Sequence, residues 1–233
     1  PSYKNWEIIT RKHEPITLSI DELERLQNFE FNLSSVKPFL KKQGEATRVM
    51  KALDIARDYL VFECRTGQRI SDIKRFDLKD YDNDKWTFTP RKGNRLSSKT
   101  VTVHFKGYCA PAISILHKYN WKMPVVSEQK INDNIKTACK IAGINSDTVT
   151  YRWAQNKRIR ISGPKYEFLS SHSGRRSFIT LALQAGIPIE YVMLLTGITE
   201  YNTIKHYRGK FQDSNVEDYL NSISSKTVMK KAQ

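Results

Sequence analysis

The sequence predicts an α+β domain that is mainly helical, with a small antiparallel β-sheet and basic hairpins. Apolar residues recur at helical spacing from Met50 to Phe62 and again in several shorter segments. Between residues 80 and 105 the period changes to two, which is typical of strands. Hydrophobic residues make up 39% of the 233 residues, enough to build a core. This length fits one large domain or two small ones.

The charge balance indicates a polyanionic partner, with nucleic acid as the first choice. Lys and Arg total 39 against 24 Asp and Glu, which gives a formal net charge of +15. The alternative is a basic protein without such a partner.

The remaining composition favours a protein of a reducing compartment without cofactors. Cys64, Cys109 and Cys139 are odd in number, far apart and without the spacing of a zinc site. No stretch approaches the roughly 18 apolar residues of a membrane span, and there is no signal peptide. We therefore expect no metal, no membrane partner and a cytoplasmic location.

The N-terminal part begins with a polar, basic segment at residues 1–15, either a linker remnant or a strap that contacts DNA. Ser19 and Glu22 form the capping box of a first helix, and an apolar stripe follows. Residues 34–46 are polar and contain Pro38, which predicts a loop or a short insertion.

A long helix is predicted from Ala46 to Gly67, followed by a second short helix over residues 70–76. Arg69 stands at the junction, where the N–H groups of a helix start and a guanidinium can bind one anion. Asp72 follows three residues later. It either holds the Arg69 guanidinium in place or serves as a helix N-terminal charge.

Two strands and a basic tip follow this pair of helices. Residues 86–88 and 101–105 alternate in hydrophobicity, and Gly93 with its following Asn is a turn signal between them. Arg91 and Arg95 lie on this tip and are predicted to bind DNA.

Two helices, at residues 109–120 and 128–143, precede a second predicted hairpin that pairs residues 148–151 with 157–161. Its basic residues alternate with aromatic ones, which suits a track along a DNA backbone. A solvated hairpin without contacts is the alternative. The residues assigned to DNA binding here are Arg152, Lys157, Arg158 and Arg160.

The last part of the chain contains the residues that can attack a phosphodiester. His172 and Arg175 stand three apart, on one face of a predicted helix. The next helix begins at Pro188 and ends at Gly197, and Tyr207 follows ten residues after that glycine. An arginine fork matches phosphate oxygens, a histidine passes a proton near neutral pH, and a tyrosine can become a covalent nucleophile.

The ordered set of three motifs resembles the tyrosine recombinases, also called the phage-integrase family. The motifs are T-G-Q-R-I-S-D at 66–72, H-x-x-R at 172–175, and L-x-G at 195–197 with Tyr207 ten residues later. The match runs from about Ile16 to Phe211, over most of the chain.

The resemblance implies a domain organisation. Residues 16–212 form the catalytic domain, and the family's N-terminal core-binding domain is absent from this chain. Residues 213–233 form a C-terminal tail helix and a mobile end, and the tail docks either on a neighbouring subunit or on its own domain. The isolated domain is expected to be a monomer, and the full-length protein a homo-tetramer on DNA.

The resemblance also implies a catalytic set of Arg69, Lys92, His172, Arg175 and Tyr207, without metal or cofactor. Tyr207 attacks the scissile phosphate and forms a 3′-phosphotyrosyl ester, while a 5′-hydroxyl leaves. A free tyrosine has a pKa near 10, so such a nucleophile needs a base and nearby positive charge. The two arginines stabilise the charge of the phosphorane, His172 helps to move the phenol proton, and Lys92 protonates the leaving oxygen.

Several assignments keep an alternative. Lys99 is the alternative to Lys92 as the catalytic lysine. Ile198 stands where many family members have His or Trp, so the site either works without that donor or takes it from another group, such as His206. Arg176, beside the catalytic arginine, is assigned to DNA binding.

The implied function is site-specific recombination of double-stranded DNA in the bacterial nucleoid, by which a mobile element is integrated or excised. One alternative is strand relaxation like that of a type IB topoisomerase. Another is an integrase-derived protein that binds DNA but has lost catalysis, which Ile198 makes plausible. Among eleven tyrosines, Tyr201 is the nearest rival of Tyr207, and the spacing from Gly197 favours Tyr207.

Overall fold

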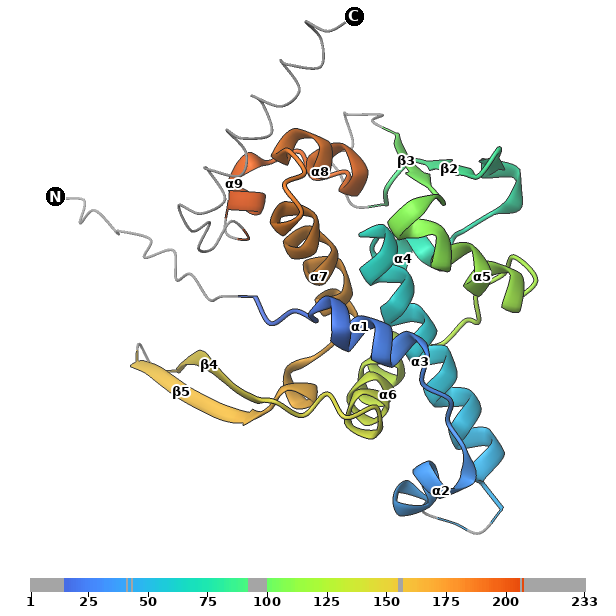
Figure 1. The fold of residues 1–233 in the computed structure, drawn as a ribbon, viewed down its shortest axis with the longest axis vertical. Coiled ribbons are helices and arrows are strands. Elements are labelled where there is room, and N and C mark those ends of the chain that lie inside the picture. Colours follow the sequence, from blue (N-terminus) through green and yellow to red (C-terminus); the bar gives the residue numbers. More distant parts are fainter. Residues whose placement is uncertain are drawn as a thin grey trace, which may run out of the picture.

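The computed structural model confirms a mainly helical fold with small antiparallel sheets (Figure 1). It describes residues 15–40, 42, 44–91, 100–154, 157–205 and 207, without the side chains of residues 152–158 and 205. The helices are α1 (Ile20–Gln27), α2 (Leu33–Val36), α3 (Ala46–Thr66), α4 (Ile70–Ile73), α5 (Ala110–Lys118), α6 (Glu128–Ile141), α7 (Ser171–Gln184), α8 (Ile189–Thr196) and α9 (Tyr201–Lys205). Short 3₁₀ helices lie at Lys37–Phe39, Leu78–Asp80, Gly107–Cys109 and Lys165–Phe168. The strands are β1 (Tyr81–Asp82), β2 (Lys85–Phe88), β3 (Val101–His104), β4 (Asp147–Ala154) and β5 (Lys157–Pro164).

Helix α3 is the centre of the fold. Every residue from Asp58 to Thr66 is buried, so the second half of the helix is covered on all sides. The covering helices are α1, α5, α6 and α7. Gly67 ends α3 in the left-handed conformation, with φ of 71°, and its amide donates to the Glu63 carbonyl at 2.8 Å. The predicted end of the helix is thus confirmed, and Arg69 follows at the exit from the core.

The first predicted hairpin is present as strands β2 and β3, which extend a sheet begun by β1. The register pairs Trp86 with Val103, and both side chains are buried. The Trp86 ring stacks on Phe88 at 4.0 Å and packs against Phe76 at 5.2 Å. These contacts fix the base of the hairpin on the core, while its tip with the Gly93 turn lies outside the described residues.

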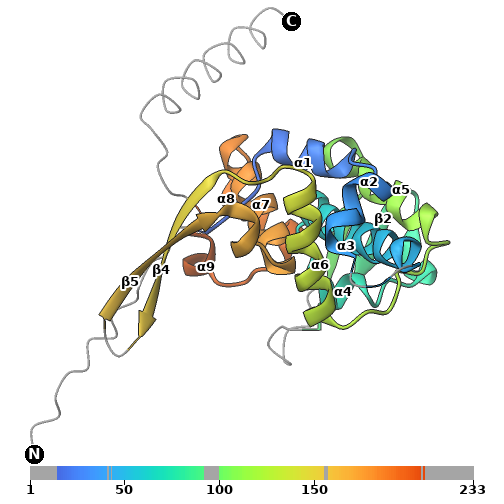
Figure 2. The ribbon, with the colours of Figure 1, turned by 90° about the horizontal axis from the view of Figure 1, so that it is seen from below.

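The second predicted hairpin is confirmed as an antiparallel ribbon of β4 and β5. Its register pairs Tyr151 with Arg160. Figures 1 and 2 show the ribbon reaching out from the helical body as an arm. Val149 and Ile159 are exposed on it, and a two-stranded ribbon cannot build a core of its own. The arm therefore leaves apolar side chains exposed to solvent.

The segment 34–46 was wrongly predicted as a loop or insertion, because α2 and a 3₁₀ turn occupy its first part. The Asn32 side chain accepts from the Ser35 amide at 3.0 Å, a capping box that the prediction overlooked. Val36 is then buried in a small cluster with Leu53. The capping box predicted at α1 is confirmed, and the predicted tail helix from residue 213 lies outside the described residues.

Cys64 and Cys139 are buried and free. Within the part of the chain that the structure describes, no cluster of His, Cys, Asp and Glu has the arrangement of a metal site. In the same part, no helix is both long and apolar enough to cross a membrane.

Helices α3 and α7 approach each other closely at Gly174. A Cβ at this position would lie 2.6 Å from the Glu63 Cβ and 2.9 Å from the Leu60 carbonyl oxygen. Only glycine therefore fits this crossing without a shift of one helix. Because Arg175 is the next residue, the close approach also sets the position of that arginine relative to α3.

We expect Gly174→Ala to lower the free energy of unfolding by about 1–3 kcal/mol, because the added methyl group overpacks the α3–α7 contact. Helix propensity alone predicts the opposite sign, a gain of about 0.5–1 kcal/mol for alanine over glycine inside a helix. Urea denaturation of the two proteins distinguishes these outcomes, and a more stable variant would contradict the close contact.

Candidate active site

The structure brings Arg69 and Arg175 together from two different helices. Arg69 is the N-cap residue of α4, and Arg175 lies in α7. The Nη1 atom of Arg175 donates to the Gly67 carbonyl oxygen at 2.7 Å, two residues before Arg69. Arg175 is only 3% exposed, and burial together with the neighbouring Arg69 cation lowers the pKa of Arg175 to about 10. The Arg69 cation is therefore close enough to act on Arg175, and the Arg175 side chain is shielded from water.

Each of these guanidinium groups keeps a buried nitrogen without an acceptor among the described residues. The atoms are Nη1 of Arg69 and Nη2 of Arg175. Buried polar groups are nearly always hydrogen-bonded, and burying an uncompensated charge is unfavourable. Two adjacent cations with free donors are suited to one oxyanion, whose charge relieves their repulsion and whose oxygens accept their N–H groups.

Tyr207 lies within electrostatic range of the same arginine. Its backbone amide donates to the Ile204 carbonyl at 2.8 Å, and its side chain packs, partly buried, against the cluster that contains Phe178 and Val192. The Tyr207 phenol acts electrostatically on Arg175 and opposes the lowering of its pKa. The structure thus places Arg69, Arg175 and Tyr207 in one neighbourhood, although they come from three separate motifs.

The other predicted catalytic and DNA-binding residues are exposed or partly buried, or they lie outside the described residues. His172 is exposed in the first turn of α7, Arg176 is partly buried, and Arg91 and Arg160 are exposed. The residues predicted for the site that fall outside the described residues are Lys92, Arg95, Lys99 and His206. For Arg152, Lys157 and Arg158, the structure describes the strand backbone but not the side chains.

Asp72 anchors the base of the first hairpin. It is 2% exposed, and its Oδ1 accepts from the Arg91 amide at 2.9 Å. This hydrogen bond joins α4 to the chain immediately before Lys92. Asp72 also acts electrostatically on Arg175 and, like Tyr207, opposes the lowering of the Arg175 pKa. The carboxylate therefore connects the arginine site to the hairpin that carries both candidate lysines.

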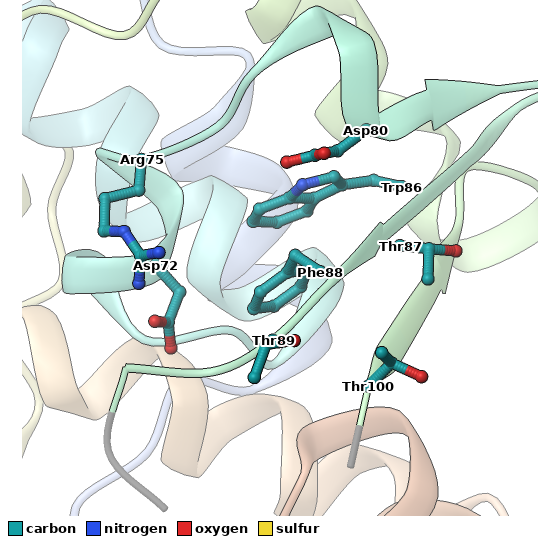
Figure 3. Close-up of a pocket in the computed structure, with 8 residues that line it drawn as sticks. All are labelled: Asp72, Arg75, Asp80, Trp86, Thr87, Phe88, Thr89 and Thr100. Atoms are coloured by element: carbon teal, nitrogen blue, oxygen red, sulfur yellow. The ribbon is translucent and has the colours of Figure 1, made fainter. Parts of the chain in front are cut away.

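A pocket of about 300 Å³, lined in part by Asp72, lies between α4 and the base of the hairpin (Figure 3). The Trp86 indole Nε1 is buried there without a hydrogen-bond partner among the described residues. The residues that line the pocket are Asp72, Arg75, Asp80, Trp86, Thr87, Phe88, Thr89 and Thr100. Of these, Asp72 also acts electrostatically on Arg175.

Ile198 takes part in packing. Its side chain is 9% exposed and belongs to the cluster of Phe178, Val192 and Ile204. An alkyl side chain in such a cluster supplies no hydrogen-bond donor. The Ile198 side chain thus stabilises the segment that leads to Tyr207 without contributing a polar contact of its own.

Two buried polar residues near the arginines were not predicted from the sequence. Gln68 is 1% exposed and donates from Nε2 to the carbonyl oxygens of Thr66 at 2.9 Å and Leu195 at 2.7 Å. Glu63 is fully buried in α3, and one of its carboxyl oxygens has no hydrogen-bond partner in the described part of the chain. The sequence did show Gln68 inside the motif at 66–72 and Glu63 inside an apolar run. The partners of such polar side chains depend on the tertiary fold.

Burial raises the pKa of Glu63 well above its usual value of 4.5, against the opposing effects of the Ile70 amide and the Arg175 cation. The folded protein therefore holds a proton that the unfolded chain releases above about pH 4.5. The stability linked to this proton is present below that pH and is lost as pH rises toward the raised pKa.

We expect Glu63→Gln to become increasingly more stable than the unsubstituted protein as the pH rises from about 5 to about 8, because glutamine never ionises. Thermal denaturation over this range measures the difference in melting temperature between the two proteins. The contributions of all other titrating groups cancel in this difference. A difference in melting temperature that stays constant with pH would show that Glu63 is already ionised in the fold.

Sequence comparison and structure comparison give different results. The sequence matches no protein-family model, and none of the curated proteins matches it. Among solved structures, XerA recombinase aligns with a TM-score of 0.52 and 19% identity, over 91% of this chain and 67% of that one. The XerH site-specific recombinase bound to its difH substrate, in a pre-cleavage complex, aligns with a TM-score of 0.52 and 18% identity, over 94% of this chain and 57% of that one.

A post-cleavage complex of XerH with a palindromic difH substrate aligns with a TM-score of 0.50 and 17% identity, over 89% of this chain and 53% of that one. The chain thus spans about two thirds of the XerA chain and little more than half of the XerH chains. At these identities the likeness concerns the fold, and the fold predicted from the three motifs is confirmed: this chain has the fold of a tyrosine recombinase catalytic domain.

Proposed function

We propose that the chain is the catalytic domain of a site-specific recombinase that cuts and rejoins DNA through a 3′-phosphotyrosyl intermediate. The observation that carries this proposal is the arginine site. Arg69 and Arg175 each keep a buried N–H donor, and the Tyr207 phenol interacts with Arg175. Two fixed cations beside a phenol are what an attack of tyrosine on a phosphodiester requires.

In the proposed cleavage, the two free guanidinium donors bind the non-bridging oxygens of the scissile phosphate. The Tyr207 oxygen attacks phosphorus, the new O–P bond forms, and the bond from phosphorus to the 5′ oxygen breaks. His172 helps to accept the phenol proton, and Lys92, or Lys99 in its place, gives a proton to the leaving oxygen. Rejoining is the reverse reaction with the 5′-hydroxyl of a partner strand. Asp72 supports the reaction by anchoring the hairpin of these lysines through the Arg91 amide.

Double-stranded DNA is the proposed partner. The net charge of +15 favours a polyanion, and the XerH structures that share the fold hold a difH substrate. Contacts to the DNA backbone are assigned to the first hairpin through Arg91 and Arg95, to α7 through Arg176, and to the β4–β5 arm, where Arg160 is exposed. The full-length protein is proposed to act as a homo-tetramer on a mobile element in the bacterial nucleoid, and the isolated domain to be a monomer.

A second candidate is a protein that binds DNA without cleaving it. The observation in its favour is Ile198, which is packed in an apolar cluster where many recombinases have a polar donor. In that case the arginine pair would hold a backbone phosphate without reaction at Tyr207.

We expect a nicked suicide DNA to give a covalent protein–DNA adduct that is lost in Tyr207→Phe, because the substitution removes only the attacking oxygen. Denaturing gel electrophoresis measures the adduct. Tyr201→Phe is the matched control, since Tyr201 lies on α9 with an exposed side chain and should leave the adduct unchanged.

Other outcomes of the same assay contradict the proposal in different ways. Tight DNA binding without an adduct in the unsubstituted protein would support the second candidate. Loss of the adduct in Tyr201→Phe rather than in Tyr207→Phe would show that Tyr201, and not Tyr207, is the nucleophile. Relaxation of supercoiled DNA without joining of two duplexes would support a type IB topoisomerase activity.

A further inference from the structure

We propose that Gln68 is a positioning residue for the proposed cleavage, because it fastens the end of α8 to the loop that carries Arg69. This inference rests on the proposed function and concerns how the same site is held together. Gln68 does not touch the reacting atoms in this account. It acts through the segment that leads from α8 to Tyr207.

The side-chain contacts of Gln68 use both N–H donors of its amide group. An amide NH₂ group has two N–H donors, and here they go to the carbonyl oxygens of Thr66 at 2.9 Å and Leu195 at 2.7 Å. The first acceptor is the last residue of α3, and the second lies 127 positions away in α8. With 1% of its surface exposed, the side chain is shielded from water that could replace these bonds.

Leu195 is an informative acceptor because it lies in the last turn of α8. Carbonyls in the last turn of a helix lack helical partners and need other donors. The helix ends at Gly197, which has φ of 65°, and the amides of Gly197 and Ile198 are directed to the Met193 carbonyl. The Leu195 carbonyl instead receives the Gln68 side chain, so this bond fixes where the segment toward Tyr207 begins.

The three consecutive residues 67–69 join the parts of the proposed site. The Gly67 carbonyl accepts from Arg175, and the Gln68 side chain donates to the Leu195 carbonyl of α8. The Arg69 guanidinium has a buried N–H without an acceptor among the described residues. A shift at the end of α8 therefore moves the start of the Tyr207 segment relative to both arginines. Displacement of a reacting group by about 1 Å can reduce a rate on the order of 10²-fold.

The test compares Gln68→Leu with Tyr59→Phe in α3. Tyr59→Phe is a matched control because it also removes a hydrogen bond made by a buried side chain. The Tyr59 hydroxyl donates to the Pro124 carbonyl at 2.8 Å, and Pro124 is not part of the segment toward Tyr207. Hydrogen exchange is measured by mass spectrometry without DNA, on peptides from Gly197 to Lys205. We expect exchange there to be at least about 10-fold faster in Gln68→Leu and unchanged in Tyr59→Phe, because local opening governs exchange.

A second measurement follows the rate of adduct formation on saturating suicide DNA. We expect Gln68→Leu to reduce this rate by at least about 10-fold with little change in the Kd for DNA, because the arginine pair is kept while Tyr207 is misplaced. Gln68→Met, which keeps the length of the side chain without its donors, gives the same readouts if the leucine variant does not fold.

The proposal is overturned if exchange from Gly197 to Lys205 is unaffected by the Gln68 substitutions, or if Tyr59→Phe accelerates it equally. It is also overturned if adduct formation falls only in proportion to the folded fraction of the variant. Because exchange is read without DNA, it decides the link between Gln68 and α8 even where the unsubstituted protein forms no adduct. That last result would count against the proposed function instead.

Discussion

The hydrogen bond from Arg175 to the Gly67 carbonyl is the constraint on which the site depends. A guanidinium keeps its charge at neutral pH, so its burial demands acceptors and close packing around it. The required approach of α7 to the end of α3 is possible because of two glycines. A Cβ on Gly67 would lie 2.4 Å from the Phe178 ring, and a Cβ on Gly174 would lie 2.6 Å from the Glu63 Cβ. A backbone carbonyl thus holds one nitrogen of Arg175, while another nitrogen has no acceptor among the described residues.

The elements around this bond position the Arg69 and Arg175 cations in the chain without a ligand. Helix α3 is enclosed and provides a rigid base, while α4 begins at Arg69 and its Asp72 anchors the first hairpin. Preorganised cations in a site with little water stabilise developing negative charge more strongly than mobile ones in solvent. In the proposed function, a bound phosphate would relieve the repulsion between Arg69 and Arg175.

Local signals in the sequence predicted most of the fold, because each depends on few residues. The helix end at Gly67, the strand alternation around Trp86 and the alternating β4–β5 arm are confirmed. Helix α2 was missed because its start depends on a single cap, the Asn32 side chain. The spacing of the motifs predicted the residues of the arginine site. In the structure, Arg69 and Tyr207 both act electrostatically on Arg175.

The supporting residues of the site could not be predicted in the same way. Gln68 and Glu63 are polar side chains whose partners lie on other elements, and no periodicity indicates which carbonyl or cation they will meet. The choice between Lys92 and Lys99, and the part played by His206, concern positions outside the described residues and remain predictions.

The most direct test of the account is a crystal structure of the chain with a nicked DNA duplex and vanadate in place of the scissile phosphate. The account predicts one vanadate whose oxygens lie about 3 Å from both Arg69 and Arg175, with the Tyr207 oxygen bonded at the apical position. Two arginines bound to different backbone phosphates, or a Tyr207 side chain that stays packed against its apolar cluster, would contradict it.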